Sequence, residues 1–396
     1  MAQGTTIIPA ARAAQMRGAL PFWVSLAFAG LVVIAARLGG WALLLPLVST
    51  HWLMSLLDLA TGESADNADP DTPVERLFWY RLITLIWAPV QGVLIFGLIH
   101  YAVRADHLDT FERVVLFVGL GQVTGAVGIV YAHELMHQRT RLERWLGDIL
   151  MAMVLYSHFR SEHLLVHHRH VGTPRDPVSA RYNENFHRFF PRVLHQCLRS
   201  AFRTEAERLA RKGRPWWDGA NPFWRYWALQ AGFVLLAWIL GGWSGLGLFV
   251  LQAVVAVWYL ELTNYVEHYG LTRKYLGNGR YEPVQPHHSW NAAHKASNWL
   301  LINLQRHSDH HCKPTRRFPL LQTYAAAQAP QLPFGYPLMV AIALMPPLWR
   351  RTMNWRVRKW RAMYYPEITD WEPYKTGRLP APVPAPRQGA SSAASA

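Results

Sequence analysis

H-E-L-M-H, residues 133–137, follows an apolar run, 111–131, that is long enough to cross a lipid bilayer as a helix. His133 and His137 are four residues apart, so a continuing helix places both imidazoles on one face, where they can bind one metal ion. Polar groups at membrane depth are costly unless they find a partner, and a metal ion supplies one. The stretch therefore predicts a membrane helix that ends in part of a metal site.

Two further histidine clusters lie downstream, E-H-L-L-V-H-H at 162–168 and H-S-D-H-H at 307–311. His163 and His167 repeat the four-residue spacing, while His168 points about 100° further round a helix and can reach a neighbouring ion. The last cluster follows the i, i+3, i+4 pattern of a helix face. Imidazole binds zinc, copper or iron, and the three clusters hold more imidazoles than one ion can use. The sequence therefore predicts two metal ions.

The amino-acid composition favours a membrane protein, because 51% of the 396 residues are hydrophobic and only 16% are charged. The formal net charge is +15, but the basic residues fall between apolar stretches, as in cytoplasmic loops, and do not indicate nucleic-acid binding. Cys197 and Cys312 are the only cysteines, which excludes a disulfide framework, a four-cysteine zinc site and a fused thiolate-bound iron domain. An electron carrier must therefore be a separate protein.

Apolar stretches of about 20 residues qualify as membrane-spanning helices. We expect six of them, at 20–37, 41–59, 82–103, 111–131, 224–243 and 246–262, with turns at Gly39-Gly40 and within 241–247. The predicted fold class is all-α, a polytopic membrane protein with about six transmembrane helices and a histidine-rich metal domain on the cytoplasmic side.

The number of spans predicts which side of the membrane the clusters share. With a cytoplasmic N-terminus, spans four and six both end in the cytoplasm, together with the histidine clusters that follow them. Basic residues within 199–214 and 350–361 fall on the same side, as the positive-inside rule requires. We therefore expect a cytoplasmic N-terminal segment, 1–19, a transmembrane bundle with a cytoplasmic catalytic region, 20–377, and a disordered tail, 378–396.

Longer strings surround the clusters: E-H-L-L-V-H-H-R-H-V-G-T-P-R-D-P-V-S-A-R at 162–181, N-Y-V-E-H-Y-G-L at 264–271 and L-Q-R-H-S-D-H-H at 304–311. Together with H-E-L-M-H, they resemble the motifs of the integral-membrane alkane 1-monooxygenases, within the wider class of histidine-rich membrane di-iron hydroxylases and desaturases. Desaturases share the histidine boxes but not the last two surrounding strings, which favours hydroxylation. The chain departs from the family's usual pattern at Val166, Gly172 and Cys312, and no histidine is lost.

The resemblance implies two non-haem iron ions on the cytoplasmic side of a bacterial inner membrane. It implies that O2 and two electrons, delivered by rubredoxin or ferredoxin and its NAD(P)H-dependent reductase, are used to hydroxylate the terminal carbon of an alkane. The other expected partners are membrane lipid and the hydrophobic alkane-type substrate. The iron ligands carried over from the family are His133, His137, His163, His167, His168, His268, His307, His310 and His311.

Two further sets of residues are predicted around this centre. Carboxylates beside the ligand candidates are expected to accept the second ring N–H of a ligating imidazole, namely Glu134, Glu162, Glu267 and Asp309. Side chains on the second span are expected to set how deeply an alkyl chain inserts, namely Ser49, Trp52, Ser55 and Leu56.

The sequence leaves alternatives to terminal alkane hydroxylation. A methyl-aromatic monooxygenase of the xylene type is the nearest alternative, because its substrate also presents a methyl group, and a fatty-acyl desaturase comes next. A zinc protease would use Glu134 as its general base, but a catalytic zinc needs only three protein ligands. A metal transporter would need ionisable residues inside the spans, which hold few.

Overall fold

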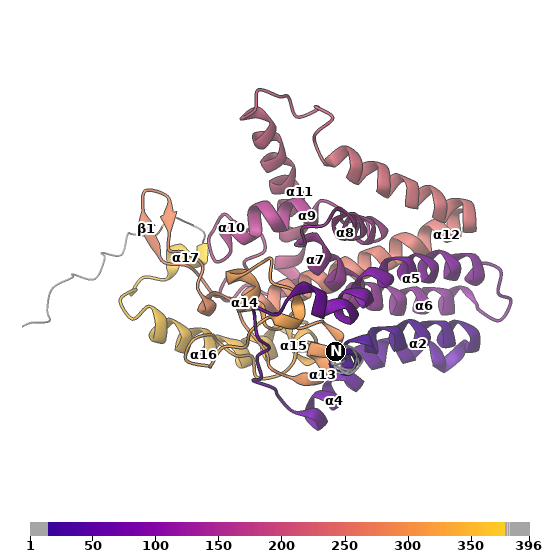
Figure 1. Ribbon diagram of the computed structural model, residues 1–396, viewed down its shortest axis with the longest axis horizontal. Helices are drawn as coiled ribbons and strands as arrows, with labels where there is room; N and C mark the ends of the chain where they lie inside the picture. Colours follow the sequence, from indigo (N-terminus) through magenta and orange to yellow (C-terminus); the bar gives the residue numbers. More distant parts are fainter. Residues whose placement is uncertain (1–14, 377, 379, 381–396) are drawn as a thin grey trace, which may run out of the picture.

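The computed structural model describes residues 15–376, 378 and 380, and this part of the chain is almost entirely helical. Most of the predicted tail and most of the predicted N-terminal segment lie outside the described residues. Within them the only strands, β1 (Tyr275–Gly277) and β2 (Arg280–Tyr281), form an antiparallel hairpin. The all-α prediction is confirmed (Figure 1).

The α-helices are α2 (Ser25–Leu38), α3 (Leu45–Val48), α4 (Met54–Thr61), α5 (Phe78–Ala102), α6 (Thr110–Val123), α7 (Val130–Met136), α8 (Arg141–Met153), α9 (Phe159–Glu162), α10 (His168–His170), α11 (Phe186–Ala210), α12 (Phe223–His268), α13 (Lys295–Leu300), α14 (His307–Cys312), α15 (Tyr336–Ala343), α16 (Pro346–Tyr364) and α17 (Glu372–Thr376). Three π-helical segments interrupt them, η3 (Ser49–Leu53), η5 (Thr124–Ile129) and η6 (His163–His167). The 3₁₀ turns are η1 (Leu20–Val24), η2 (Gly40–Leu44), η4 (Val74–Leu77), η7 (Pro286–His288) and η8 (Phe318–Leu320).

Five continuous helical segments among the described residues are long and apolar enough to cross a membrane: Gln15–Leu38, Gly40–Thr61, Val74–Ala102, Thr110–Met136 and Phe223–His268. The first four correspond to the first four predicted spans. The fifth contains both remaining predicted spans, because the backbone of Gly242 leaves the helical region (φ 57°) and the chain folds back, bringing Gly245 against the carbonyl of Ala237. Figure 1 shows α12 as two arms that meet at this bend.

The membrane helix that leads to the first histidine cluster has a well-defined start. The side chain of Asp109 accepts a hydrogen bond from the backbone N–H of Glu112, and the Glu112 carboxylate accepts one from the backbone of Asp109. This reciprocal cap satisfies two backbone donors that the first turn leaves free. The helix then runs through α6, η5 and α7 without leaving helical geometry, so His133 and His137 are placed by a continuous rod.

Glycines allow this rod to pack directly against the second arm of α12. A methyl group on Gly121 would lie 2.7 Å from the carbonyl oxygen of Gln252, and one on Gly125 would lie 2.9 Å from that of Ala256. Small residues four apart are the usual means by which membrane helices approach closely. The hydroxyl of Thr124 also donates to the side chain of Gln252 across this contact. The two histidine-bearing helices therefore have a fixed relative position.

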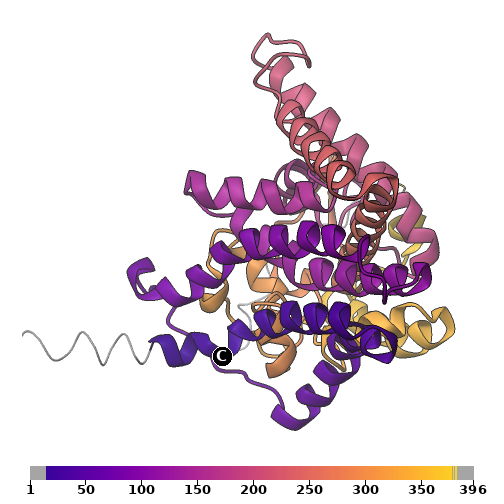
Figure 2. The same ribbon diagram turned by 90° about the vertical axis from the view of Figure 1, so that its right-hand side faces the viewer.

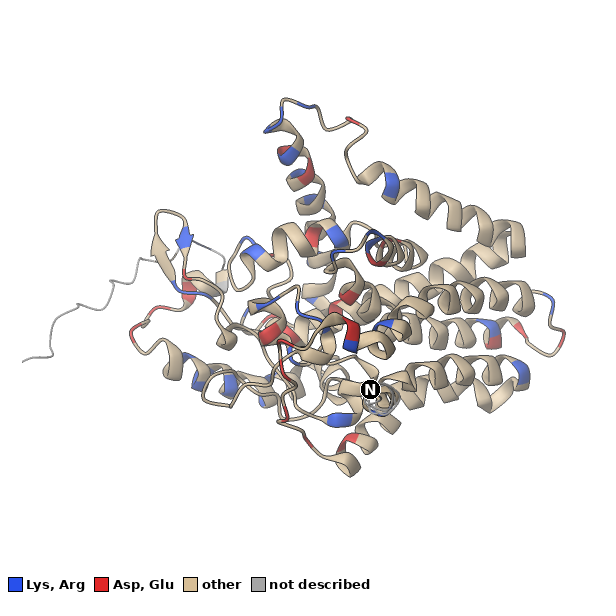
Figure 3. Ribbon diagram, in the orientation of Figure 1, with Lys and Arg blue, Asp and Glu red and all other residues tan. Residues whose placement is uncertain are grey.

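Charged residues are distributed unevenly over the molecule. Figure 3 shows few of them on α5, α6 and the second arm of α12, and many on α11, α16 and the connecting segments. The short helices that carry histidines, including α10 and α14, gather at the end of the long helices where α7 and α12 finish (Figures 1 and 2). An apolar bundle that bears a charged, histidine-rich region at one end is the arrangement of an integral membrane protein.

We predict that Gly121→Ala destabilises the protein, because the added methyl group overlaps backbone and side-chain atoms of α12. Overpacking of this kind costs about 1–3 kcal/mol. The apparent melting temperature of the detergent-solubilised protein measures the effect. Gly232→Ala, on a helical position with nothing within 4 Å, is the control and should be neutral or stabilising. An unchanged melting temperature for Gly121→Ala would contradict the close helix contact.

Candidate metal centre

The second histidine cluster has an unusual backbone. Residues His163–His167 form a π-helical segment, in which hydrogen bonds join residues five apart instead of four. His163 and His168 therefore share a face, and His167 points elsewhere. The sequence-based expectation paired His163 with His167 from the spacing of a regular α-helix, and the structure corrects it.

The first group of imidazoles draws on all three clusters. Its ligand atoms all lie within 4.8 Å of one another, and its members are His133, His137, His163, His168 and His310. The Nε2 atoms of His137 and His163 are 3.0 Å apart, and those of His163 and His168 are also 3.0 Å apart. His310 completes the group, with its Nε2 3.1 Å from that of His168.

The second group contains the remaining four predicted ligands. Its members are His167, His268, His307 and His311, all of them buried. The Nε2 of His307 lies 3.1 Å from that of His268 and 3.0 Å from that of His311. The two groups are neighbours, since the ring centroids of His168 and His311 are 4.7 Å apart. The structure thus brings all nine predicted histidines into one double cluster.

The chemistry of the cluster fits bound metal ions. Burial, and after it the neighbouring imidazoles, hold the pKa of His163 and of His310 well below the usual range, so both rings are neutral and keep a lone pair. Neutral rings can share single protons in pairs, but the buried Nε2 atoms of His133 and His167 have no hydrogen-bond partner among the described residues. Nitrogen separations near 3 Å suit atoms that share one ion at about 2.0–2.1 Å.

One ligand candidate has a carboxylate partner that the sequence reasoning missed. The Nδ1 atom of His167 lies 3.0 Å from Oδ2 of Asp176, and both side chains are buried. Asp176 is in turn held by the hydroxyl of Ser179, which donates to the same oxygen. A carboxylate on the outer ring nitrogen fixes the orientation of the imidazole and raises its basicity. Asp176 ends the string H-R-H-V-G-T-P-R-D and lies nine positions after His167. A carboxylate in this string was the sequence feature that could have identified Asp176 as a partner of a histidine.

The four predicted carboxylate partners have different surroundings. Glu267 reaches the cluster, with Oε2 3.3 Å from Nε2 of His307, which is the inward nitrogen and not the outer one expected. Glu134 accepts from the side chain of Gln138 instead of from an imidazole. Asp309 pairs with Arg316 and accepts from Tyr324, and the oxygens of Glu162 have no hydrogen-bond partner among the described residues. Neighbouring positions on a helix point in different directions, so adjacency in sequence did not predict these contacts.

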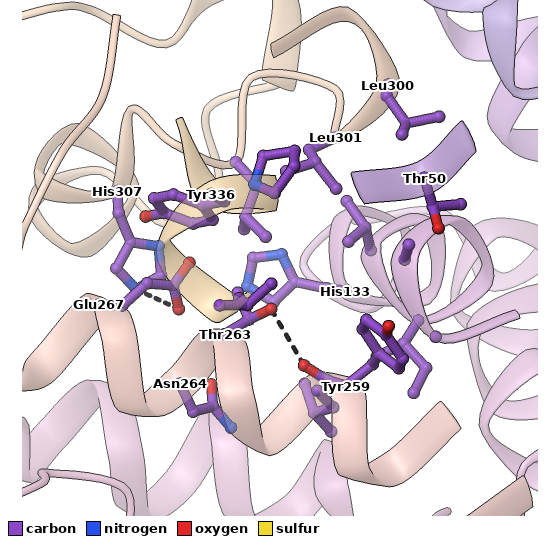
Figure 4. A pocket seen from close by; sticks show the side chains of 18 of the residues that line it. Thr50, His133, Tyr259, Thr263, Asn264, Glu267, Leu300, Leu301, His307 and Tyr336 are labelled. Atoms are coloured by element: carbon purple, nitrogen blue, oxygen red, sulfur yellow. Dashed lines mark hydrogen bonds and ion pairs between the residues drawn. The ribbon is translucent and has the colours of Figure 1, made fainter. Parts of the chain in front are cut away.

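A cavity lies beside the histidines (Figure 4). The empty space within it, open solvent included, is about 730 Å³, and its walls are mostly apolar, with Ile129, Val130, Leu304 and Val340 among them. It reaches both histidine groups. The site residues that line it are His133, His163, His307 and Glu267. All three π-helical segments contribute to its walls, as such segments often do at functional sites.

The structure does not bring the four predicted channel residues to this cavity. Trp52 and Leu56 are 59% and 61% exposed on the outer side of the bundle. Ser49 is buried elsewhere, and the hydroxyl of Ser55 donates to the carbonyl of His51. The second span does line the cavity, but through Thr50 and His51. The π-helical turn at Ser49–Leu53 rotates the inward face away from the positions that a regular helix would present.

A third group of potential ligands, Glu282, His287 and His288, lies outside the double cluster. The hydroxyl of Tyr365 contacts all three side chains and occupies the space between them. Because that hydrogen-bond network satisfies the group, it differs from the double cluster, where inward nitrogens have no partner among the described residues.

Comparison with known proteins agrees with this geometry. Residues 109–343 match the fatty acid desaturase family. The chain is 39% identical to alkane 1-monooxygenase 2 of Pseudomonas aeruginosa, over 80% of this chain and 85% of the relative, and 40% identical to alkane 1-monooxygenase 1 of the same organism, over 81% and 84%. It is 27% identical to the hydroxylase component of xylene/toluene monooxygenase from Pseudomonas putida, over 72% and 71%.

We predict that His310→Ala strongly lowers the metal content of the purified protein, because His310 is the member of the first group that comes from the third cluster. Metal per chain is measured by elemental analysis, and membrane insertion is checked by fractionation. His195→Ala, at an exposed position on α11, should retain the full metal content. A His310→Ala protein with the metal content of the parent would rule out a ligand role for His310.

Asp176→Asn should weaken metal binding while keeping the shape of the site. Loss of such a supporting carboxylate costs about 10–100-fold in metal affinity. A chelator titration followed by residual metal content gives the affinity. Equal retention of metal by the variant and the parent would mean that the Asp176–His167 contact serves only folding.

Proposed function

Because this chain belongs to the alkane 1-monooxygenase family of membrane enzymes, we propose that it hydroxylates the terminal carbon of alkanes or alkyl chains to a primary alcohol. One oxygen atom of O2 enters the product and the other leaves as water. The observation that carries the proposal is the apolar cavity walled by histidines of both groups.

The reaction explains why such a cavity ends at imidazoles. An unactivated C–H bond offers no acidic proton and no electrophilic centre, so acid–base or nucleophilic side chains cannot attack it. Two non-haem irons, when bound, would supply the O2-dependent redox chemistry that the bond requires. The protein would hold them with the nine histidines, five in the first group and four in the second. Asp176 would orient His167, and the apolar walls would hold the chain and exclude water.

The substrate would enter from lipid and the electrons from water. The cavity is bounded by membrane-spanning helices, including the segment with Thr50 and the rod with Val130, so an insoluble chain can reach it without leaving the bilayer. On the other side, Asp176 lines a polar pocket together with Arg181, Arg192 and Arg361. Guanidinium groups there suit an acidic electron carrier.

We propose rubredoxin or ferredoxin, with its NAD(P)H-dependent reductase, as the electron supply, and the bacterial inner membrane as the location, with the histidine end in the cytoplasm. The positive-inside rule supports this orientation, since α11 and α16 at that end are rich in arginine. Anionic lipid headgroups would bind the same basic helices.

A methyl-aromatic hydroxylase is the second candidate. The similarity to the xylene/toluene monooxygenase component supports it, because that relative covers 72% of the chain. An aromatic methyl group would meet the same histidines. The alkane assignment rests on the higher identity to the alkane 1-monooxygenases and on the apolar side chains that line the cavity.

The deciding experiment uses membranes that contain the full-length protein, supplied with rubredoxin, its reductase and NADH. A panel of alkanes and methyl-aromatics is offered, and the products are identified by mass spectrometry. Primary alcohols from alkanes, lost in His310→Ala, support the proposal. Benzylic alcohols alone would favour the second candidate, and unsaturated products would indicate desaturation.

We predict that Thr50→Trp shortens the longest alkane that is hydroxylated, because the indole would fill part of the cavity beside Thr50. The maximum chain length among the products is the measurement. Trp52→Ser, two positions away and pointing outward, is the matched control and should leave the chain-length profile unchanged. If Thr50→Trp kept the full range of chain lengths, the cavity would not be the alkyl site.

A further inference from the structure

A basic pocket lies apart from the metal centre, where α9, the end of α11 and the beginning of α12 meet. Each of these helices contributes one arginine to it, and the three are Arg160, Arg208 and Arg225. The empty space within the pocket, open solvent included, is about 900 Å³, which is more than a single ion needs. None of the nine clustered histidines lines it, so the proposed hydroxylation does not account for its arginines.

Two buried carboxylates hold the arginines in place. Nη1 of Arg160 lies 2.7 Å from both oxygens of Asp148, and Nη2 of Arg225 lies 3.1 Å from one of them. Glu205 is bound by Nη2 of Arg208 at 2.8 Å. Because buried carboxylates are costly unless they are paired, they require these guanidinium groups. Three arginines against two carboxylates still leave an excess of positive charge.

The arginines also have donors left for a ligand. Arg225 is held between two rings, with its Cζ 5.4 Å from the centroid of Trp145 and 5.5 Å from that of Tyr226. Its Nε is buried without a hydrogen-bond partner among the described residues. Residues 219–222, which lead into the first turn of α12, line the same pocket, and the start of a long helix attracts negative charge. The pocket is therefore suited to an anion.

The surroundings of the pocket are those of a membrane surface. α12 belongs to a membrane-spanning segment, and the pocket lies at its first turn. Indole rings are enriched where a membrane meets water, and the exposed tryptophans beside the pocket are Trp216, Trp217, Trp224 and Trp227. Farther along the first arm of α12, Leu235 and Ile239 are exposed as well. An anion that is attached to a hydrocarbon chain fits this place better than a free ion, because the chain can lie along the arm.

We propose that the pocket formed by Arg160, Arg208 and Arg225 binds the phosphate group of an anionic phospholipid, drawn from the leaflet on the histidine side of the membrane. The excess positive charge favours a headgroup with a net negative charge over a zwitterionic one, whose own cation would lie near the arginines. Arginine binds phosphate oxygens through paired N–H groups, as this pocket presents them. The site takes no part in the hydroxylation and does not rest on it.

A bound lipid would also support the second histidine cluster. Leu164 and Leu165 line the pocket, and they belong to η6, the π-helical segment that carries His163 and His167. Arg160 lies three residues before His163 on the same stretch of chain. A ligand that binds only the folded protein stabilises it. Anionic lipid should therefore raise the apparent melting temperature of the protein.

The test titrates delipidated full-length protein, in a nonionic detergent, with phosphatidylglycerol or with phosphatidylcholine of the same acyl chains, and counts bound lipid by native mass spectrometry. The parent should bind one phosphatidylglycerol at least 10-fold more tightly than phosphatidylcholine. Arg225→Gln and Arg208→Gln should each weaken phosphatidylglycerol binding roughly 10-fold, as expected for loss of hydrogen bonds to a charged group. Arg199→Gln, at an exposed position of α11 outside the pocket, removes the same charge and should keep the parent affinity.

Three results would overturn the proposal. Equal affinity of the parent for the two lipids would remove the preference for an anion, and equal weakening by Arg199→Gln would mean a diffuse attraction to the basic surface. Inorganic phosphate that binds as tightly as phosphatidylglycerol would identify a site for a free anion instead. Should the pocket variants fail to fold, a photoreactive phosphatidylglycerol decides on the parent protein: labels within 160–165 or 216–227 support the site, and labels only elsewhere contradict it.

Discussion

The mutual contact of nine imidazoles, eight of them buried, is the constraint on which the rest of the structure depends. Neutral rings whose inward nitrogens lie about 3 Å apart cannot all satisfy one another, because each pair shares a single proton. Burial without satisfaction is costly, and cations bound in the two groups would remove that cost. Metal binding would therefore be coupled to folding of this end of the molecule, and the bundle must hold four separate chain segments close together.

The backbone conformation shows how these segments bring their histidines together. His163 and His168 face the same group only because their segment is π-helical. Just before the third cluster, Ile302 and Asn303 adopt left-handed conformations (φ 43° and 59°), which is unfavourable for a β-branched residue. That turn directs Leu301 and Leu304 into the cavity and begins the approach to His307. Strain of this kind persists where the surrounding contacts demand one geometry, and here it lies between the cavity and the metal ligands.

The sequence predicted the parts that follow from composition and regular spacing. Apolar length gave the membrane helices, and the bend at Gly242 divides α12 close to the predicted boundary. Histidine spacing and the family resemblance together identified the residues that converge. Helical periodicity failed wherever the backbone departs from 3.6 residues per turn, at His163–His167 and at Ser49–Leu53, which is why the grouping of His167 and the inward face of the second span were not predicted. Asp176 was missed because its contact depends on a loop that folds back onto His167.

The third histidine cluster lies on α14, a short helix that belongs to none of the membrane-spanning segments. Other contacts must therefore hold it against the bundle. Its place is fixed by ion pairs at the polar end of the bundle. Asp309 is bound by Arg316 within the same segment, and Arg317 reaches Glu143 on α8, which also pairs with Arg81 of a membrane helix. The turn that precedes α14 lies beside the membrane helices at the cavity, where Leu301 and Leu304 form part of the wall. The apolar bundle therefore shapes the space for the hydrocarbon, while buried charges set how near the last three imidazoles come to it.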